Sequence, residues 1–208
     1  MHLRFTENWE KNGGSEGLGR SIGSLQCLPS LGISQNQSAA DEGDVETAAG
    51  ILELMNNSGI AIDVNHVNSA MRACWGWNNK MHRAGKYLFD LLPELGLQPT
   101  IISFTSLIGA LRTGQLQDIL SAYKDMKTQG IEPDQVFAET YLVSVLQLEK
   151  SQQVLQARTP QQLQELLRER PVERLKAARQ AIADFRKGKM KLSGLCFNIG
   201  EALKQLRS

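Results

Sequence analysis

The chain has 208 residues, with 23 basic and 22 acidic side chains and a formal net charge of +1 at pH 7. This length fits one medium domain, or an elongated array with a flexible tail. No apolar run approaches the roughly 18 residues that a membrane-spanning helix needs, so the sequence predicts no membrane partner. The first twenty residues lack the apolar core of a secretory signal and the acid-poor, arginine-rich composition of a clear transit peptide.

Charge is spread unevenly along the chain. Residues 41–63 carry six acids and no base, whereas residues 135–208 carry thirteen bases and seven acids. Such a basic segment can meet phosphate, although solvated helix faces are the simpler interpretation. The three cysteines, at 27, 74 and 196, are odd in number and far apart, so they predict no disulfide framework and no metal site. They favour a reducing compartment.

The N-terminal segment 1–42 is predicted to be a largely disordered arm, with room for a degenerate helix around residues 33–40. Residues 11–24 are rich in Gly and Ser and cannot bury enough apolar area to offset their ordering entropy. Residues 17–23 come close to a dinucleotide-binding fingerprint. That fingerprint requires a preceding strand and a following helix, and neither is predicted here.

Apolar residues recur at helical spacing along most of the remaining chain. They predict helices from Asp44 toward Gly59, and over 64–74, 81–92, 101–112, 116–128, 136–148, 161–169, 172–187 and 194–206. Pro93 and Gly188 are expected to end two of these helices, and Leu120, Tyr123 and Met126 are expected to face the core. No alternation typical of strands is present, so the predicted fold class is all-α.

One short phrase recurs in register between the helices. It reads Gly59–Asp63, then Gly96–Thr100, then Gly130–Asp134, and its glycines lie 37 and then 34 residues apart. A fixed period of this size is the signature of stacked helical repeats. We therefore expect an α-solenoid of helix–turn–helix repeats over 43–150, closed by a basic C-terminal helical cap over 151–208.

Residues 101–134 closely resemble a pentatricopeptide repeat. The resemblance lies in the opening 101–108, a turn glycine at 114, the Ala-Tyr-Lys-Asp-Met stretch at 122–126 and the closing phrase at 127–134. Residues 64–100 match more loosely, and 43–63 match only the second helix and the closing phrase. The resemblance implies helical hairpins stacked into a superhelix, with the first helices lining a groove that holds single-stranded RNA, one base per repeat.

The resemblance also implies which residues contact RNA. In the best repeat, Thr105 and Asp134 would meet the edge of a base and Ile102 would pack on its face. In the preceding repeat, Asn68 and Thr100 take the edge positions, and Asn65 takes the face position. Two further residues complete the predicted set: Val136, which opens the following half-repeat, and Arg112, near the family's phosphate-facing cation.

The predicted function is therefore non-catalytic binding of single-stranded RNA in organellar RNA processing, stability or translation, with no cofactor and no metal. The family suggests a mitochondrion or plastid, with the cytoplasm as the other setting. Stacking contributes about 1–3 kcal/mol per base, so two or three repeats bind RNA only weakly. A protein partner or a longer repeat array would be needed for specific recognition.

Several alternatives stay open at this point. The same repeats could form a protein–protein interaction scaffold on a tetratricopeptide-like α-solenoid, docking a partner on the C-terminal helices. Trp75 and Trp77 either stack on bases or fill the gap between hairpins. The basic cluster at 186–191 either holds phosphate or forms a solvated loop between helices.

Overall fold

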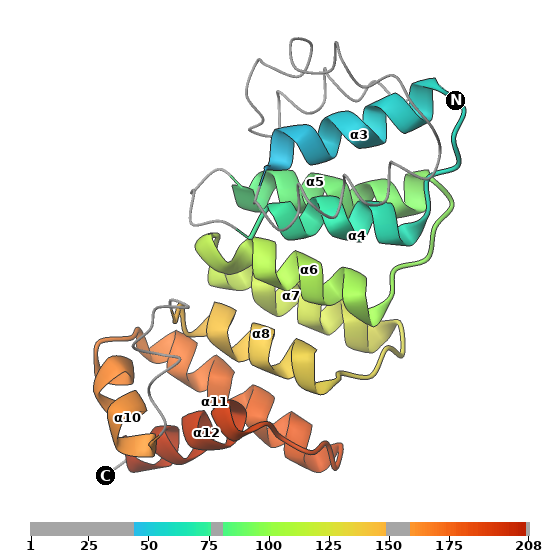
Figure 1. Cartoon of the computed structure of the whole chain (residues 1–208). Coiled ribbons are helices and arrows are strands. Elements are labelled where there is room, and N and C mark those ends of the chain that lie inside the picture. The colour runs from blue at the N-terminus through green and yellow to red at the C-terminus, as the bar shows by residue number, and fades with distance from the viewer. Residues whose placement is uncertain (1–43, 76–80, 149–158, 207–208) are drawn as a thin grey trace. The chain divides into compact units, whose positions relative to one another are not determined.

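The structure is a computed structural model that describes residues 44–75, 81–148 and 159–206. Every regular element in these ranges is a helix, and none of the described residues forms a strand (Figure 1). The predicted all-α fold class is confirmed. The predicted arm over 1–42, with the glycine-rich stretch inside it, lies outside the described residues. The chain divides into two compact units, one ending at Gly114 and the other beginning at Gln115, and each is described by itself.

The first unit is a stacked set of helices. The hairpin of α4 and α5 is its centre, because α4 packs against α3, α5 and α6, and α5 packs against α6 and the 3-10 helix η1 (Figure 1). This stacking buries the apolar stripe that each helix leaves exposed by itself. The bounds are α3 Val45–Asn57, α4 Val64–Ala73, α5 Met81–Glu94, α6 Ile101–Ala110 and η1 Leu111–Thr113.

The second unit packs a repeat helix against the C-terminal helices. Helix α8 contacts α7, α11 and α12, and α12 also contacts α10 and α11. The bounds are α7 Leu116–Thr128, α8 Gln135–Val145, α10 Pro160–Arg168, α11 Val172–Lys187 and α12 Gly194–Gln205.

The recurring glycine phrase ends one helix and starts the next. Gly59, Gly96 and Gly130 have φ of 70°, 71° and 71°, the left-handed conformation that glycine adopts without a steric cost. At the end of α7, the amide of Gly130 donates to the Lys127 carbonyl (3.0 Å) and the amide of Ile131 donates to the Met126 carbonyl (3.1 Å). The other two glycines close α3 and α5 with the same pair of bonds, the pattern of a Schellman motif.

Four residues after each of these glycines, a short polar side chain caps the following helix. Asp63, Thr100 and Asp134 are the N-caps of α4, α6 and α8. Each accepts a hydrogen bond from an amide of the first turn, which otherwise has no partner inside the helix. Helices α3, α10 and α12 begin in the same way, with N-caps at Asp44, Thr159 and Ser193.

Three helix ends lie two or three residues from their predicted positions. Helix α5 runs through Pro93 to Glu94, because a proline in the last turn removes a single backbone bond while the amide of Leu95 still donates to Leu91 (2.9 Å). Helix α6 gives way after Ala110 to the tighter turn η1, rather than continuing as α-helix to residue 112. Helix α8 ends at Val145, three residues before the predicted end.

The predicted end of α11 at Gly188 is confirmed, because the helix runs to Lys187 and Gly188 is its C-cap, but the left-handed residue is the one that follows. Gly188 caps α11 with a φ of −71°, which any residue can adopt. Lys189 takes the left-handed conformation instead, with a φ of 56°, and its amide donates to the Arg186 carbonyl (3.1 Å). A side chain with a Cβ is strained in this conformation.

We therefore expect the substitution Lys189→Gly to stabilise the chain by about 0.5–1 kcal/mol, because it relieves this strain. The measurement is chemical unfolding followed by far-UV circular dichroism. The matched control is Lys187→Gly, which places glycine inside α11 and should lower stability by up to about 1 kcal/mol. Equal effects of the two substitutions would contradict the assignment of strain to Lys189.

Candidate nucleic-acid interface

The common cap geometry places α4, α6 and α8 in the same register. Counted from the cap, the second residues are Asn65, Ile102 and Val136, and the fifth residues are Asn68, Thr105 and Glu139. All three second residues are exposed, whereas Asn68 and Thr105 are buried. The first helices of the repeats thus present an exposed side chain near the start and a buried polar one a turn later.

The exposed second position carries large apolar side chains in two of the three repeats. Ile102 is 54% exposed and Val136 is 62% exposed, and only Val172 and Phe197 among the other described large apolar residues are comparably exposed. A single exposed apolar residue needs no explanation. The recurrence of exposed apolar side chains at one register position is different, because neither side chain is buried in the core between helices. Within its own unit, each of these two side chains is free to contact an apolar ligand.

Asn68 is the most unusual polar residue of this set. Its side chain is buried, with 4% exposure, and neither its amide oxygen nor its amide nitrogen has a hydrogen-bond partner among the described residues. A buried polar group in this state costs about 1–3 kcal/mol. The side chain offers both a donor and an acceptor, which matches the mixed edge of a nucleobase.

Thr105 lies at the equivalent position on α6, which packs directly on α4. Its hydroxyl donates to the Ile101 carbonyl (2.7 Å), so the oxygen keeps its lone pairs as acceptors. Thr100 is held by a capping box, in which the Ser103 amide donates to the Thr100 hydroxyl (3.4 Å) and the Thr100 amide donates to the Ser103 hydroxyl (3.0 Å). Thr100 is therefore fixed in place at the start of α6.

Asp134 and Val136 belong to the second unit. The Phe137 amide donates to Oδ1 of Asp134 (2.7 Å), which fixes the carboxylate at the exposed start of α8. The other carboxylate oxygen remains an acceptor for a further donor. The predicted pairing of Thr105 with Asp134 would join residues of the two units, because Thr105 lies in the first unit and Asp134 in the second.

Arg112 lies in the interior of the first unit rather than on its surface. Its side chain is 6% exposed, and Nη2 donates to the Trp75 carbonyl. Burial lowers the pKa of this guanidinium. The indole Nε1 of Trp75 in turn donates to the Ser106 carbonyl (2.9 Å). Arg112 therefore ties the end of α4 to η1, and the interpretation of Trp75 as a side chain filling the gap between hairpins is confirmed. Trp77 lies outside the described residues.

Other chemistry is sparse in the described part of the chain. No group of three His, Cys, Asp or Glu side chains is arranged there to hold a metal ion. Burial raises the pKa of the Cys74 thiol to about 12, so this cysteine stays protonated at neutral pH and is a poor nucleophile. None of the helices in the described ranges combines the length and apolar character that crossing a bilayer requires.

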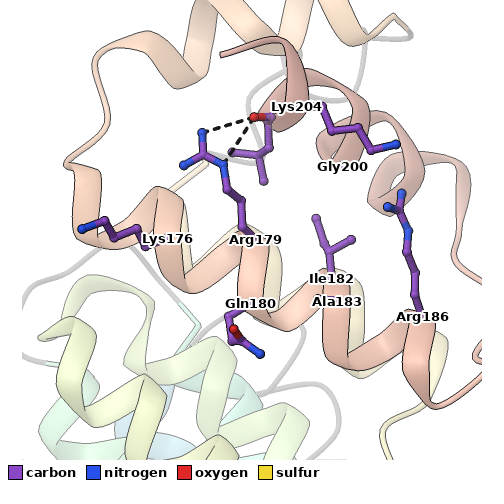
Figure 2. A pocket seen from close by; sticks show the side chains of 9 residues that line it. Lys176, Arg179, Gln180, Ile182, Ala183, Arg186, Gly200 and Lys204 are labelled. Carbon is purple, nitrogen blue, oxygen red and sulfur yellow. Dashed lines mark hydrogen bonds between the residues drawn. The ribbon is translucent and has the colours of Figure 1, made fainter. Parts of the chain in front are cut away.

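One basic surface lies outside the predicted site. Lys176, Arg179 and Arg186 of α11, with Lys204 of α12, line a groove of about 440 Å³ in the second unit (Figure 2). The sequence signal was available, because residues 176, 179 and 186 are separated by three and seven positions and so share one helix face. The sequence-based prediction instead drew attention to the loop cluster at 186–191.

The fold and this register define a protein built from stacked helical hairpins. The family model for the pentatricopeptide repeat domain matches residues 50–112 and 87–138. The resemblance stated from the sequence is thereby confirmed over residues 50–138, the part of the chain that the family model covers. Pentatricopeptide repeats form a helical-repeat family that in general binds RNA, and its members are commonly organellar. No curated protein matches the chain.

Proposed function

We propose that the chain binds single-stranded RNA through the first helices of its repeats, without catalysing a reaction, and that it acts in RNA processing, stability or translation in a mitochondrion or plastid. The observation that carries this proposal is the recurrence of exposed Ile102 and Val136 at one register position. An ordinary solvated helix would place polar residues there. The match of residues 50–138 to the pentatricopeptide repeat domain supports the same ligand class.

The side chains divide into two groups by their chemistry. Ile102 and Val136 offer apolar contact to the faces of bases, and Asn65 takes the same position in the preceding repeat with weaker contact. Buried Asn68 and Thr105 offer hydrogen bonds to base edges, together with the cap residues Thr100 and Asp134. Arg112 supports the hairpin from inside and has no part in the proposed contact with RNA.

The expected affinity is low. Stacking contributes about 1–3 kcal/mol per base, and few repeats are available, so the binding free energy falls between roughly −4 and −8 kcal/mol. These values correspond to dissociation constants from about millimolar to about micromolar. A partner protein or a longer array would raise the affinity by adding bases to the contact.

The proposal predicts that the double substitution Ile102→Ala with Val136→Ala weakens RNA binding about fivefold or more, because each change removes apolar contact with a base. The measurement is fluorescence anisotropy of labelled single-stranded RNA pools with the full chain, at two salt concentrations. The matched control is Val172→Ala, an equally exposed valine outside the repeat register, which should leave the affinity unchanged.

Two outcomes would count against this function. One is no detectable binding at tens of micromolar protein in low salt. The other is an equal loss of affinity in the control and in the double variant, because binding would then not depend on the repeat register. A pull-down that recovers a stoichiometric protein and no RNA would favour the interaction scaffold instead. The compartment is tested by imaging a C-terminal fluorescent fusion against mitochondrial and plastid markers.

A further inference from the structure

The groove between α11 and α12 gathers positive charge around a small apolar floor. Figure 2 shows Lys176 toward one end of the groove and Arg186 at the other, both on α11, with Lys204 reaching toward Arg186 from α12. Ile182 and Leu203 form part of the floor. Packing α11 on α12 requires the apolar residues, but it does not require cations along the rim.

Few of these charges are neutralised by the protein. Glu201 is the carboxylate beside the groove, and it lies 2.7 Å from the Lys204 ammonium and 3.5 Å from the Arg186 guanidinium. Arg179 donates from Nε and Nη2 to the Leu203 carbonyl (3.3 and 3.2 Å), which is a neutral acceptor. Lys176 is exposed and has no partner in the part of the chain that the structure describes. Among the described residues that line the groove there are four bases and no acid, and Glu201 beside it is shared by two of those bases, so the groove is cationic.

The bonds of Arg179 also fix where its charge lies. Arg179 is held across the groove because the Nε–Nη2 edge of its guanidinium donates to a carbonyl on α12. Its Nη1 remains available to another acceptor. Arginine and lysine donors spaced along a groove match the repeating phosphates of a polyanion. A single small anion would need the donors to converge on one point, and those of α11 are instead spread over eleven residues, from Lys176 to Arg186.

An exposed aromatic ring lies on the same face of α12 as the cation at the groove. Phe197 is 51% exposed and precedes Lys204 by seven residues, which is two helical turns. A cationic track with a neighbouring exposed aromatic ring is the arrangement that single-stranded nucleic acids use, because the backbone follows the cations and a base stacks on the ring. An acidic peptide would gain from the cations alone.

We propose that the groove between α11 and α12 binds the phosphate backbone of single-stranded RNA, with Phe197 stacking on a base. The inference takes its ligand from the proposed function and adds a second, sequence-independent contact in the C-terminal helices. Lys176, Arg186 and Lys204 contact phosphates, and Arg179 is positioned by its bond to Leu203 to do the same. This contact offsets the weak affinity of the few repeats.

The test is a triple variant, Lys176→Gln, Arg186→Gln and Lys204→Gln, in the full chain. The matched control is Lys187→Gln, Lys189→Gln and Lys191→Gln, which removes the same charge from the same unit outside the groove. With a labelled random-sequence RNA at low salt, the groove variant should raise the dissociation constant tenfold or more. The slope of log affinity against log salt should fall in magnitude by about 2, since each single-strand phosphate contact contributes about 0.7.

The groove proposal is overturned if the two triple variants lose affinity equally, or if the salt slope is unchanged in the groove variant. It is also overturned if poly-glutamate of matched charge competes as well as RNA, because the groove would then be a docking site for an acidic protein segment. The proposed function fails separately, when the Ile102 and Val136 substitutions have no effect while the groove variant still loses affinity. Phe197→Ala should add a further loss of about fivefold.

Discussion

Replacing Phe185 with alanine should lower the free energy of unfolding by about 3–5 kcal/mol. Phe185 is 1% exposed and contacts two tyrosine rings, with centroids 6.0 Å from Tyr123 and 6.3 Å from Tyr141 in edge-on arrangements. Tyr141 also stacks on Phe137 at 5.8 Å. Truncation would remove one wall of this aromatic cluster and leave a cavity that the helices around it cannot fill. Urea unfolding followed by circular dichroism measures the loss.

The control for this prediction is Phe197→Ala. The same chemical change on an exposed ring should alter stability by less than about 0.5 kcal/mol. If Phe185→Ala cost no more than Phe197→Ala, the aromatic cluster would not be the core of the second unit. Phe197 thus separates stability from binding, because its replacement is expected to weaken RNA affinity only.

Replacing Gly109 with alanine should destabilise the first unit by about 1–3 kcal/mol, although alanine is the better helix former. A Cβ on Gly109 would overlap the indole ring of Trp75, which is fixed by its bond to the Ser106 carbonyl. The ring cannot move away without losing that bond or displacing the carbonyl that accepts from Arg112. Thermal unfolding monitored by circular dichroism and tryptophan fluorescence measures the effect.

Gly194→Ala is the control, because a Cβ at this position of α12 meets nothing within 4 Å. This substitution should be neutral or slightly stabilising. A neutral result for Gly109→Ala would mean that Trp75 does not pack on α6 in solution. The tryptophan fluorescence of the folded variant provides a second check on that contact.

Much of the helix pattern was predictable because its determinants are local. Asp44, Thr159 and Ser193 start helices because a short polar side chain can bond to an amide only two or three residues on. Gly96 ends α5 because a left-handed residue there requires no interaction with another helix. Such signals depend on neighbours in sequence and can be read without knowing the fold.

The errors arise where packing decides the outcome. Leu120 was expected to face the core, whereas the structure leaves it partly exposed and buries Ile119, because the neighbours of α7 select which side of the helix is covered. The interior position of Arg112 depends on a carbonyl 37 residues away. No local sequence pattern predicts such a hydrogen-bond partner. The cap that Arg174 makes on the Val145 carbonyl (2.7 Å) was unpredictable for the same reason.

The candidate site was predictable only as far as the repeat register reaches. The resemblance to the pentatricopeptide repeat selected Ile102 and Val136, and the structure adds that both are exposed. That Asn68 would have no hydrogen-bond partner could not be read from sequence, because the answer depends on the atoms of the adjoining helices. The basic face of α11 could be read from the spacing of its cations, but the groove needed the structure, because it also requires α12 to pack beside α11.

The glycine turns at Gly59, Gly96 and Gly130, here called joints, divide this part of the chain into interchangeable segments. A segment copied from the residue after one joint up to and including the next carries its own helix starter and its own stop. If this segment is inserted at a neighbouring joint, it adjoins a glycine with the same left-handed backbone conformation as in its original position. Gene duplication can therefore lengthen such an array by whole hairpins, and each addition extends the stack of helices without redesigning the parts on either side.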